Sequence, residues 1–192
     1  MQALKYASSL LLGFWSATIF AVQQVGGLTI DYAVPFQENT AKAQAWQAKM
    51  NPEMQGMLRG FQIFEAPGTS RFSEARVIKL QYTSQIRGNI DAAASEAVAN
   101  IVRLPGIKNP NHTITKTKVS GQNARRVSYE SGRNDGTLGA EFLIIQDQRN
   151  QVMYQIQLIF SKRPGFNPLA STSLNDERAL AGKVLDSVQA TR

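Results

Sequence analysis

The chain has 192 residues and a net charge of +7, from 21 lysines and arginines against 14 aspartates and glutamates. Hydrophobic residues make up 43% and charged residues 18%, which indicates a globular chain rather than a disordered one. Cysteine is absent and histidine occurs once. This composition excludes disulfides, Fe–S clusters, cysteine-ligated zinc, a catalytic cysteine and a lipid-bearing cysteine.

The first residues have the pattern of an export signal. Lys5 gives a positive start, and the residues from there to Val22 carry no charge, which suits the apolar core of a secretory signal peptide. The small side chain of Ala21 marks the best cleavage site, so we expect a signal peptide at 1–21. The alternative is an uncleaved membrane anchor that extends to about residue 27. Both interpretations place the rest of the chain in the periplasm or on the extracytoplasmic side of the inner membrane.

We expect residues 28–192 to form a single domain, because no repeat, low-complexity tract or linker interrupts them. Leu28–Pro35 is predicted to be a strand that ends at its proline. Asn39–Leu58 is predicted to be a helix with Asn39 as its cap and a break or kink at Pro52. The tryptophan and methionines of this helix recur near helical spacing, and we expect this stripe to pack on the domain's own sheet.

The remaining elements follow from hydrophobic periodicity. Residues 90–104 carry an apolar stripe typical of a helix, with Asn89 as its cap. Period-two alternation predicts strands at 61–65, 76–83, 113–119, 124–130, 138–146 and 152–160, and a helical stripe closes the chain at 175–190. Since the later strands are joined by hairpin-length turns, we expect an α+β fold with a mainly antiparallel central sheet covered by helices.

Three segments resemble the PsbP-like superfamily. They are Val119–Tyr129 (VSGQNARRVSY), Tyr154–Phe160 (YQIQLIF) and Gly182–Val188 (GKVLDSV). The resemblance implies an α/β/α sandwich over about residues 28–190, with Gly121 in a tight turn and Ala124 at a close packing position. It also implies an exported accessory or binding domain, as in many bacterial members. The tryptophan that often follows the first strand in the family is missing, so the resemblance does not extend to a photosystem role.

Few residues support catalysis. His112 is the only candidate base of a Ser–His–Asp device, and no G-x-S-x-G nucleophile elbow accompanies it. Glu130, Asp135 and Glu141 flank one hairpin in positions typical of solvated turns, so nothing assigns an acid and a base. Phosphate-binding glycine patterns and EF-hand spacing are also missing from the sequence. We therefore expect a non-enzymatic protein with no catalytic, cofactor-binding or metal-binding residues.

The basic excess provides the candidate site. A face for an anionic partner is predicted from Lys116, Lys118, Arg125, Arg126, Arg133, Lys162 and Arg163. Ordinary solvated strand edges, which use such residues to resist edge pairing, are the alternative. Aromatic residues do not interleave with the basic ones, so nucleic acid is not expected as a partner, and no oligomer is predicted.

Two kinds of binding function and one enzymatic function remain open at this point. The preferred one is an exported accessory domain that binds a protein or an anionic envelope component through its sheet edge or basic face, with the membrane as a further partner if the amino-terminal segment is retained. The second is a small-ligand carrier with a pocket between the helical segment 39–58 and the sheet. The third is a hydrolase that uses a pair of carboxylates.

Overall fold

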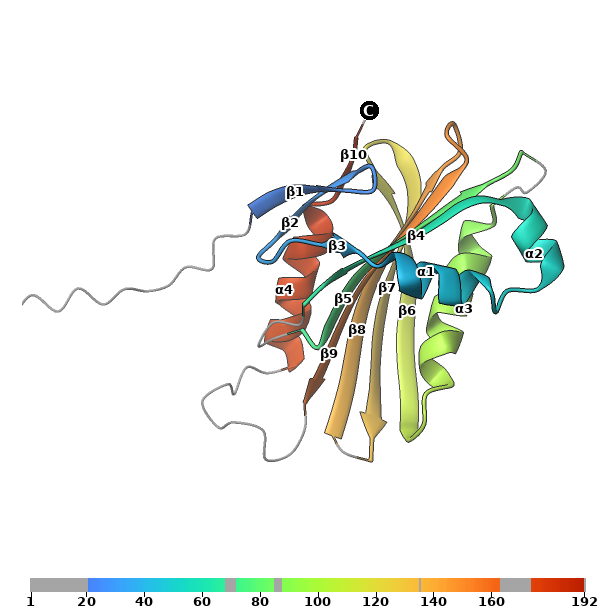
Figure 1. Ribbon diagram of the computed structural model, residues 1–192. Helices are drawn as coiled ribbons and strands as arrows, with labels where there is room; N and C mark the ends of the chain where they lie inside the picture. The colour runs from blue at the N-terminus through green and yellow to red at the C-terminus, as the bar shows by residue number, and fades with distance from the viewer. Residues whose placement is uncertain (1–20, 68–71, 85–87, 135, 163–173, 192) are drawn as a thin grey trace, which may run out of the picture.

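The computed structural model describes residues 21–67, 72–84, 88–134, 136–162 and 174–191 (Figure 1). The predicted signal segment up to residue 20 and the predicted site residue Arg163 lie outside these ranges. The chain forms a 3-stranded sheet in the order β1-β2-β10 and a 7-stranded sheet in the order β3-β4-β5-β9-β8-β7-β6. Within both sheets all neighbouring strands are antiparallel, as the sequence predicts for an α+β fold.

The large sheet is a long meander extended by an earlier hairpin. Its strands are β3 (Gln37–Glu38), β4 (Leu58–Ala66), β5 (Glu74–Tyr82), β6 (Ile107–Val119), β7 (Gln122–Arg133), β8 (Gly136–Asp147) and β9 (Val152–Lys162). Strands β6 to β9 follow each other in space as they do in the chain, while β5 joins the free side of β9. Strands β8 and β9 therefore lie inside the sheet, and β6 forms one of its edges.

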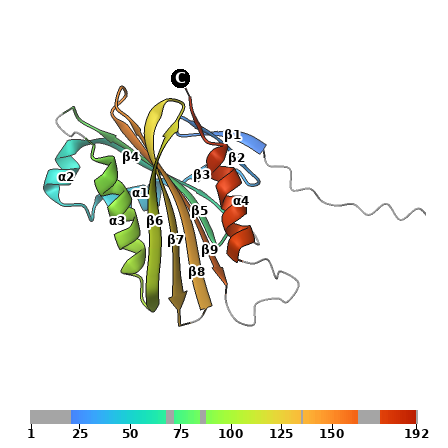
Figure 2. The ribbon, with the colours of Figure 1, turned by 180° about the vertical axis from the view of Figure 1, so that it is seen from behind.

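Helices lie on both sides of this sheet (Figures 1 and 2). Helix α3 (Ile90–Val102) packs on β6, β7 and β8, and helix α4 (Leu174–Asp186) packs on β8 and β9. Two successive residues of β7 show that these are opposite faces, because Arg125 pairs with Asp91 of α3 and Arg126 pairs with Asp186 of α4. Strand β8 is buried on both faces, which explains why it reads as an almost continuous apolar run.

The predicted helix over 39–58 is two short helices separated at the proline. Helix α1 (Thr40–Gln47) begins at Asn39, whose Oδ1 accepts a hydrogen bond from the Lys42 backbone N–H. Helix α2 (Pro52–Met57) begins at its own cap, Asn51. The expectation that the whole stripe packs on the sheet is wrong, because α2 has no buried residue and projects beyond the sheet (Figure 1). The second cap redirects the chain, so only α1 stays on the sheet.

The small sheet contains strands that the sequence analysis missed. Strand β1 (Ala21–Val25) pairs with β2 (Leu28–Tyr32) through a Gly26–Gly27 turn, and both glycines have positive φ, which side chains rarely adopt. The predicted strand over 28–35 thus ends earlier, at Tyr32. The closing helix also ends earlier than predicted, and the chain then forms β10 (Gln189–Ala190) against β2.

The described fold therefore already includes Ala21, rather than starting at Leu28. Val25 and Leu28 are 2% and 0% exposed in the core beside α4. A membrane anchor that extended to about residue 27 would have to remove β1 from this sheet. Among the described helices, none combines the length and apolar character needed to cross a membrane.

Candidate functional site

A cleft of about 780 Å³ lies over the middle of the large sheet, between the end of α1 and the side of α3. We call it the α1–α3 cleft. Its lining is formed by Trp46, Lys49, Met50, Glu74, Arg76, Ile78, Glu96, Ala97, Asn100, Ile101, Leu104, Phe142, Gln155, Gln157 and Ile159. Helix α1 packs on β4 at one side, and α3 packs on β6 to β8 at the other. The two helices thus leave the sheet between them open.

Strand β9 forms the floor of the cleft and differs between its two faces. On the α4 side Ile156 and Leu158 are fully buried. On the cleft side Gln155, Gln157 and Ile159 are only partly buried and line the opening. The sequence analysis used the apolar face of this strand and overlooked the other. Two glutamines in the interior strand of a sheet are the signal that could have located the cleft.

Arg76 of β5 is the best-anchored charge in the cleft, with 8% of its surface exposed. Its Nε donates to Glu65 Oε1 at 2.9 Å, and its Nη2 pairs with Glu74 Oε1 at 2.8 Å. The guanidinium carbon lies 5.4 Å from the centre of the Trp46 ring, within cation–π range. Arg76 therefore holds the Trp46 wall of the cleft against the sheet.

Glu65 of β4 connects this arginine to the start of α1. Lys42 forms an ion pair with Glu65, and the Asn39 side chain donates to Glu65 Oε2 at 3.0 Å. Partial burial opposes ionisation of Glu65, but the hydrogen bonds from Lys42, Arg76 and Asn39 outweigh it and lower the pKa of this carboxyl to about 2. Glu65 is thus a permanent anion at neutral pH that fixes α1 to the sheet.

The charges that line the α1–α3 cleft cancel. Lys49 and Arg76 are opposed by Glu74 and Glu96. The rest of the lining combines apolar side chains of the sheet and of α3 with the amides of Gln155, Gln157 and Asn100. Such a lining matches a neutral or zwitterionic molecule with an apolar body and a few hydrogen-bonding groups.

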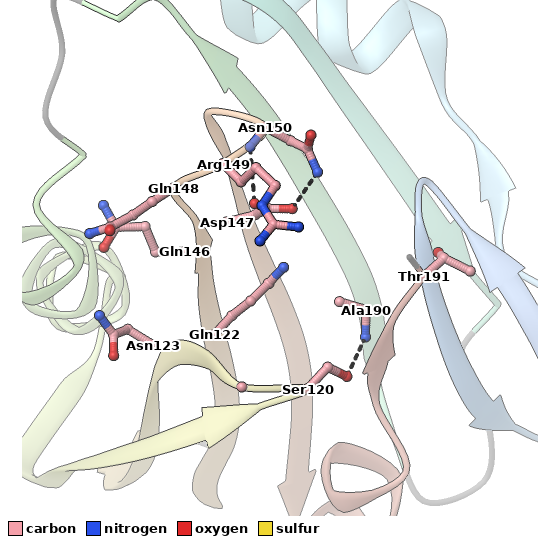
Figure 3. A pocket seen from close by; sticks show the side chains of 11 residues that line it. Ser120, Gln122, Asn123, Gln146, Asp147, Gln148, Arg149, Asn150, Ala190 and Thr191 are labelled. Carbon is pink, nitrogen blue, oxygen red and sulfur yellow. Dashed lines mark hydrogen bonds between the residues drawn. The ribbon is translucent and has the colours of Figure 1, made fainter.

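A second hollow, the polar pocket, lies at the end of the sheet (Figure 3). It has a volume of about 750 Å³ and is lined by the β6–β7 turn, the β8–β9 turn and the residues after α4. Several of its polar groups already bind one another. Asp147 accepts from the Asn150 backbone N–H and side-chain amide at 3.0 and 2.8 Å, and Ser120 Oγ accepts from the Ala190 N–H at 3.1 Å. These bonds hold the turns together, so the α1–α3 cleft is the better candidate for a ligand site.

The predicted basic face is not gathered on one surface. Lys116 and Lys118 are exposed on β6, on the α3 side of the sheet. Arg125 binds Asp91 at 2.6 Å on that side, whereas Arg126 binds Asp186 at 2.7 Å on the other. The hydrogen bond that the Arg125 side chain donates also lowers the pKa of Asp91. Arg133 and Lys162 lie at the ends of β7 and β9, at the opposite end of the sheet from the β6–β7 turn.

The paired carboxylates are arranged differently from the expectation. Glu141 is not in a solvated turn but is 2% exposed beneath α4, and burial raises its pKa despite hydrogen bonds from Ser128 and Arg178. Arg178 of α4 donates to Glu141 at 3.2 Å and to Glu130 at 2.8 Å. The arginine thus occupies the place between the two carboxylates that a glycosidic substrate would need.

The other candidate groups are dispersed. Asp135 lies outside the described residues, and His112 is exposed on β6. Within the described ranges no three histidine, aspartate or glutamate side chains come together as a metal site would require.

Comparison with known proteins adds little to this geometry. The chain matches no established protein family and no curated protein. It has distant similarity to LpqN of Mycobacterium tuberculosis, described as involved in cell envelope biogenesis, with a TM-score of 0.42 and 10% identity over 90% of this chain and 83% of that one. A Pseudomonas aeruginosa protein of unknown function, PA94, gives a TM-score of 0.38 and 15% identity over 66% of this chain and 80% of that one. Likeness at this level carries no functional argument, and the resemblance to the PsbP-like superfamily stays a prediction.

Proposed function

We propose that this protein is an exported, non-enzymatic binding domain whose ligand occupies the α1–α3 cleft. One observation carries the proposal. The central strand β9 is covered by buried apolar side chains on the α4 side, whereas on the other side its residues Gln155, Gln157 and Ile159 are only partly buried and line the space between α1 and α3. An open floor over the middle of a sheet is where a ligand can complete the packing.

The lining defines the class of ligand. Ile101 of α3, Leu104 just after this helix and Ile159 of β9 offer apolar surface, and Leu104 is 43% exposed. The amides of Gln155 and Gln157 can both donate to and accept from a ligand. We infer a small amphipathic molecule without net charge, with its apolar body against α3 and its polar group over β9.

Export is supported by the sequence. The positive start at Lys5 and the uncharged run that follows it are those of a secretory signal. We propose the periplasm or the extracytoplasmic side of the inner membrane as the location. The PsbP-like sandwich is the fold family we propose, since Gly121 has positive φ in a tight turn and Ala124 is fully buried, as that resemblance implies.

A titration with N-phenyl-1-naphthylamine, a neutral probe that fluoresces in apolar sites, tests the cleft. We expect saturable binding to the full chain. Asn100→Trp fills the cleft from an exposed position on α3, and it should weaken binding by about tenfold or more. Ser95→Trp places the same side chain at an exposed position of α3 outside the cleft lining and should leave binding unchanged.

Either of two results would overturn the proposal. One is the lack of saturable binding by the unmodified chain. The other is equal binding by the Asn100→Trp and Ser95→Trp variants, which would place the probe elsewhere.

A further inference from the structure

Strand β6 is a long edge strand. It has 13 residues, pairs with β7 along one side and ends the order of the large sheet. Its other side has no strand partner among the described residues. Side chains from Lys108 to Lys118 are all exposed. The backbone N–H and C=O groups on the outer side of β6 are therefore available to an added strand.

Only the first part of this edge has a backbone shape that prevents another strand from pairing with it. A register shift between Lys108 and Asn111 marks a bulge, Asn109 has φ 48°, and Pro110 has no N–H to offer. From Asn111 opposite Glu130 to Val119 opposite Gln122, the pairing with β7 continues without a shift. This regular stretch is long enough for an extended peptide.

The charges on β6 are all of one sign. The strand contains Lys108, Lys116 and Lys118, and no acidic residue. The neighbouring β7 arginines already bind Asp91 and Asp186, whereas Lys116 and Lys118 form no ion pair within the described part of the chain. Ile114, which points to the same face as these lysines, is 38% exposed.

We propose that β6 binds an extended, acidic segment of a partner protein as an additional strand of the sheet. Backbone hydrogen bonds would supply the affinity, and carboxylates beside Lys116 and Lys118 would select the partner. A second copy of this chain is disfavoured as the occupant, because pairing of two β6 edges would bring lysines of the two strands together. This site is separate from the α1–α3 cleft and does not depend on the function proposed for it.

Titration with synthetic peptides tests the proposal. The probe is an eight-residue peptide of alternating glutamate and valine, and calorimetry measures its affinity for the full chain. A version with every amide N-methylated keeps the charges but cannot pair as a strand, so its binding should be lost. A lysine–valine peptide should not bind. In the complex, hydrogen exchange of the β6 amides should slow.

Variants of the chain test the role of the lysines. Lys116→Glu with Lys118→Glu should weaken binding of the acidic peptide by about tenfold or more. Arg59→Glu with Lys183→Glu makes the same charge change at exposed positions off β6 and should have little effect. Asn100→Trp, which blocks the cleft, should leave peptide binding intact.

Three results would overturn the proposal. The first is that the acidic peptide does not bind. The second is that its N-methylated version binds equally well, which would show attraction by charge alone, and the third is self-association of the chain through β6. The N-methyl comparison uses only the unmodified protein, so it holds even if a charge-reversed variant fails to fold.

Discussion

Glu65 connects the two parts of the structure that form the wall of the α1–α3 cleft. Its carboxylate binds Lys42 and Asn39 at the start of α1 and Arg76 on β5. Arg76 in turn lies beside Trp46, and Trp46 stacks on Phe61 with ring centres 6.4 Å apart. A substitution of Glu65 is therefore expected to alter the cleft wall in two ways, by loosening the start of α1 and by releasing Arg76.

The pKa of Glu65 gives a pH-dependent prediction. Because the pKa falls from its ordinary value of 4.5 to about 2 in the folded chain, ionised Glu65 stabilises the fold above about pH 4.5, and this contribution is lost as the pH falls toward 2. We expect Glu65→Gln to reduce the free energy of unfolding at pH 7 by up to about 3 kcal/mol. At pH 3 the difference between the two proteins should shrink to about half.

Urea unfolding of both proteins at the two pH values measures this difference. Glu53→Gln, at an exposed position of α2, serves as the control and should change stability little at either pH. An equal loss at pH 7 and pH 3 for Glu65→Gln would show that its effect comes from packing rather than from ionisation.

At the scale of elements, β1 tests how far the folded domain extends toward the amino terminus. The Gln23 side chain donates to the backbone oxygen of Val34 at 3.1 Å and accepts from the Phe36 N–H at 2.8 Å. It thereby fixes the segment that leads from β2 to β3. Gln24, its exposed neighbour, only donates to the Thr29 hydroxyl at 3.0 Å.

We therefore expect unequal effects from two adjacent substitutions. Gln23→Ala leaves backbone groups without partners and should cost about 1–3 kcal/mol, whereas Gln24→Ala should cost less than about 0.5 kcal/mol. Chemical unfolding of the two variants beside the unmodified chain provides the comparison. If both substitutions leave the free energy of unfolding unchanged, β1 is not paired with β2 in the folded protein. That result is the one expected if an uncleaved anchor extended to residue 27.

The long elements could be predicted from sequence because their signals are local. The stripe of α3 and its cap Asn89 are visible in the chain, and Asn89 Oδ1 does accept from the N–H groups of Asp91 and Ala92. The alternation of β9 is equally clear. Strands β3 and β10 could not be found in this way, since they have two residues each and pair with distant segments, such as Gln189 with Thr29. Strand β1 was missed although its hairpin with β2 is local, because its residues were assigned to the signal segment or the anchor.

The candidate site was only partly predictable for a similar reason. A pocket between the segment 39–58 and the sheet was part of one alternative, but its depth depends on how far α3 stands from α1, which no local pattern encodes. Arg125 and Arg126 looked like free cations in the sequence because their acidic partners lie on two different helices. Glu141 looked solvated because Arg178, which meets it in the core, is distant in the chain.

For the whole molecule, the net charge of +7 belongs almost entirely to the folded domain, since Lys5 is the only charged residue in the proposed signal segment. A basic surface in the cell envelope meets anionic partners. Both proposed sites therefore depend on export, because it decides which ligands the cleft and the β6 edge encounter.

Export can be tested together with the position of cleavage. A cut after Ala21 would leave Val22 to Val25 paired with β2, since Val22 lies opposite Asp31 and Val25 opposite Leu28. The small sheet thus tolerates this cut, whereas a cut several residues later would remove β1 and expose Leu28, which is fully buried.

We expect the protein in the extracytoplasmic fraction of its host, with an intact mass that corresponds to residues 22–192. Full-length protein in the membrane fraction would indicate an anchor that ends before β1, and full-length protein in the cytoplasm would contradict export.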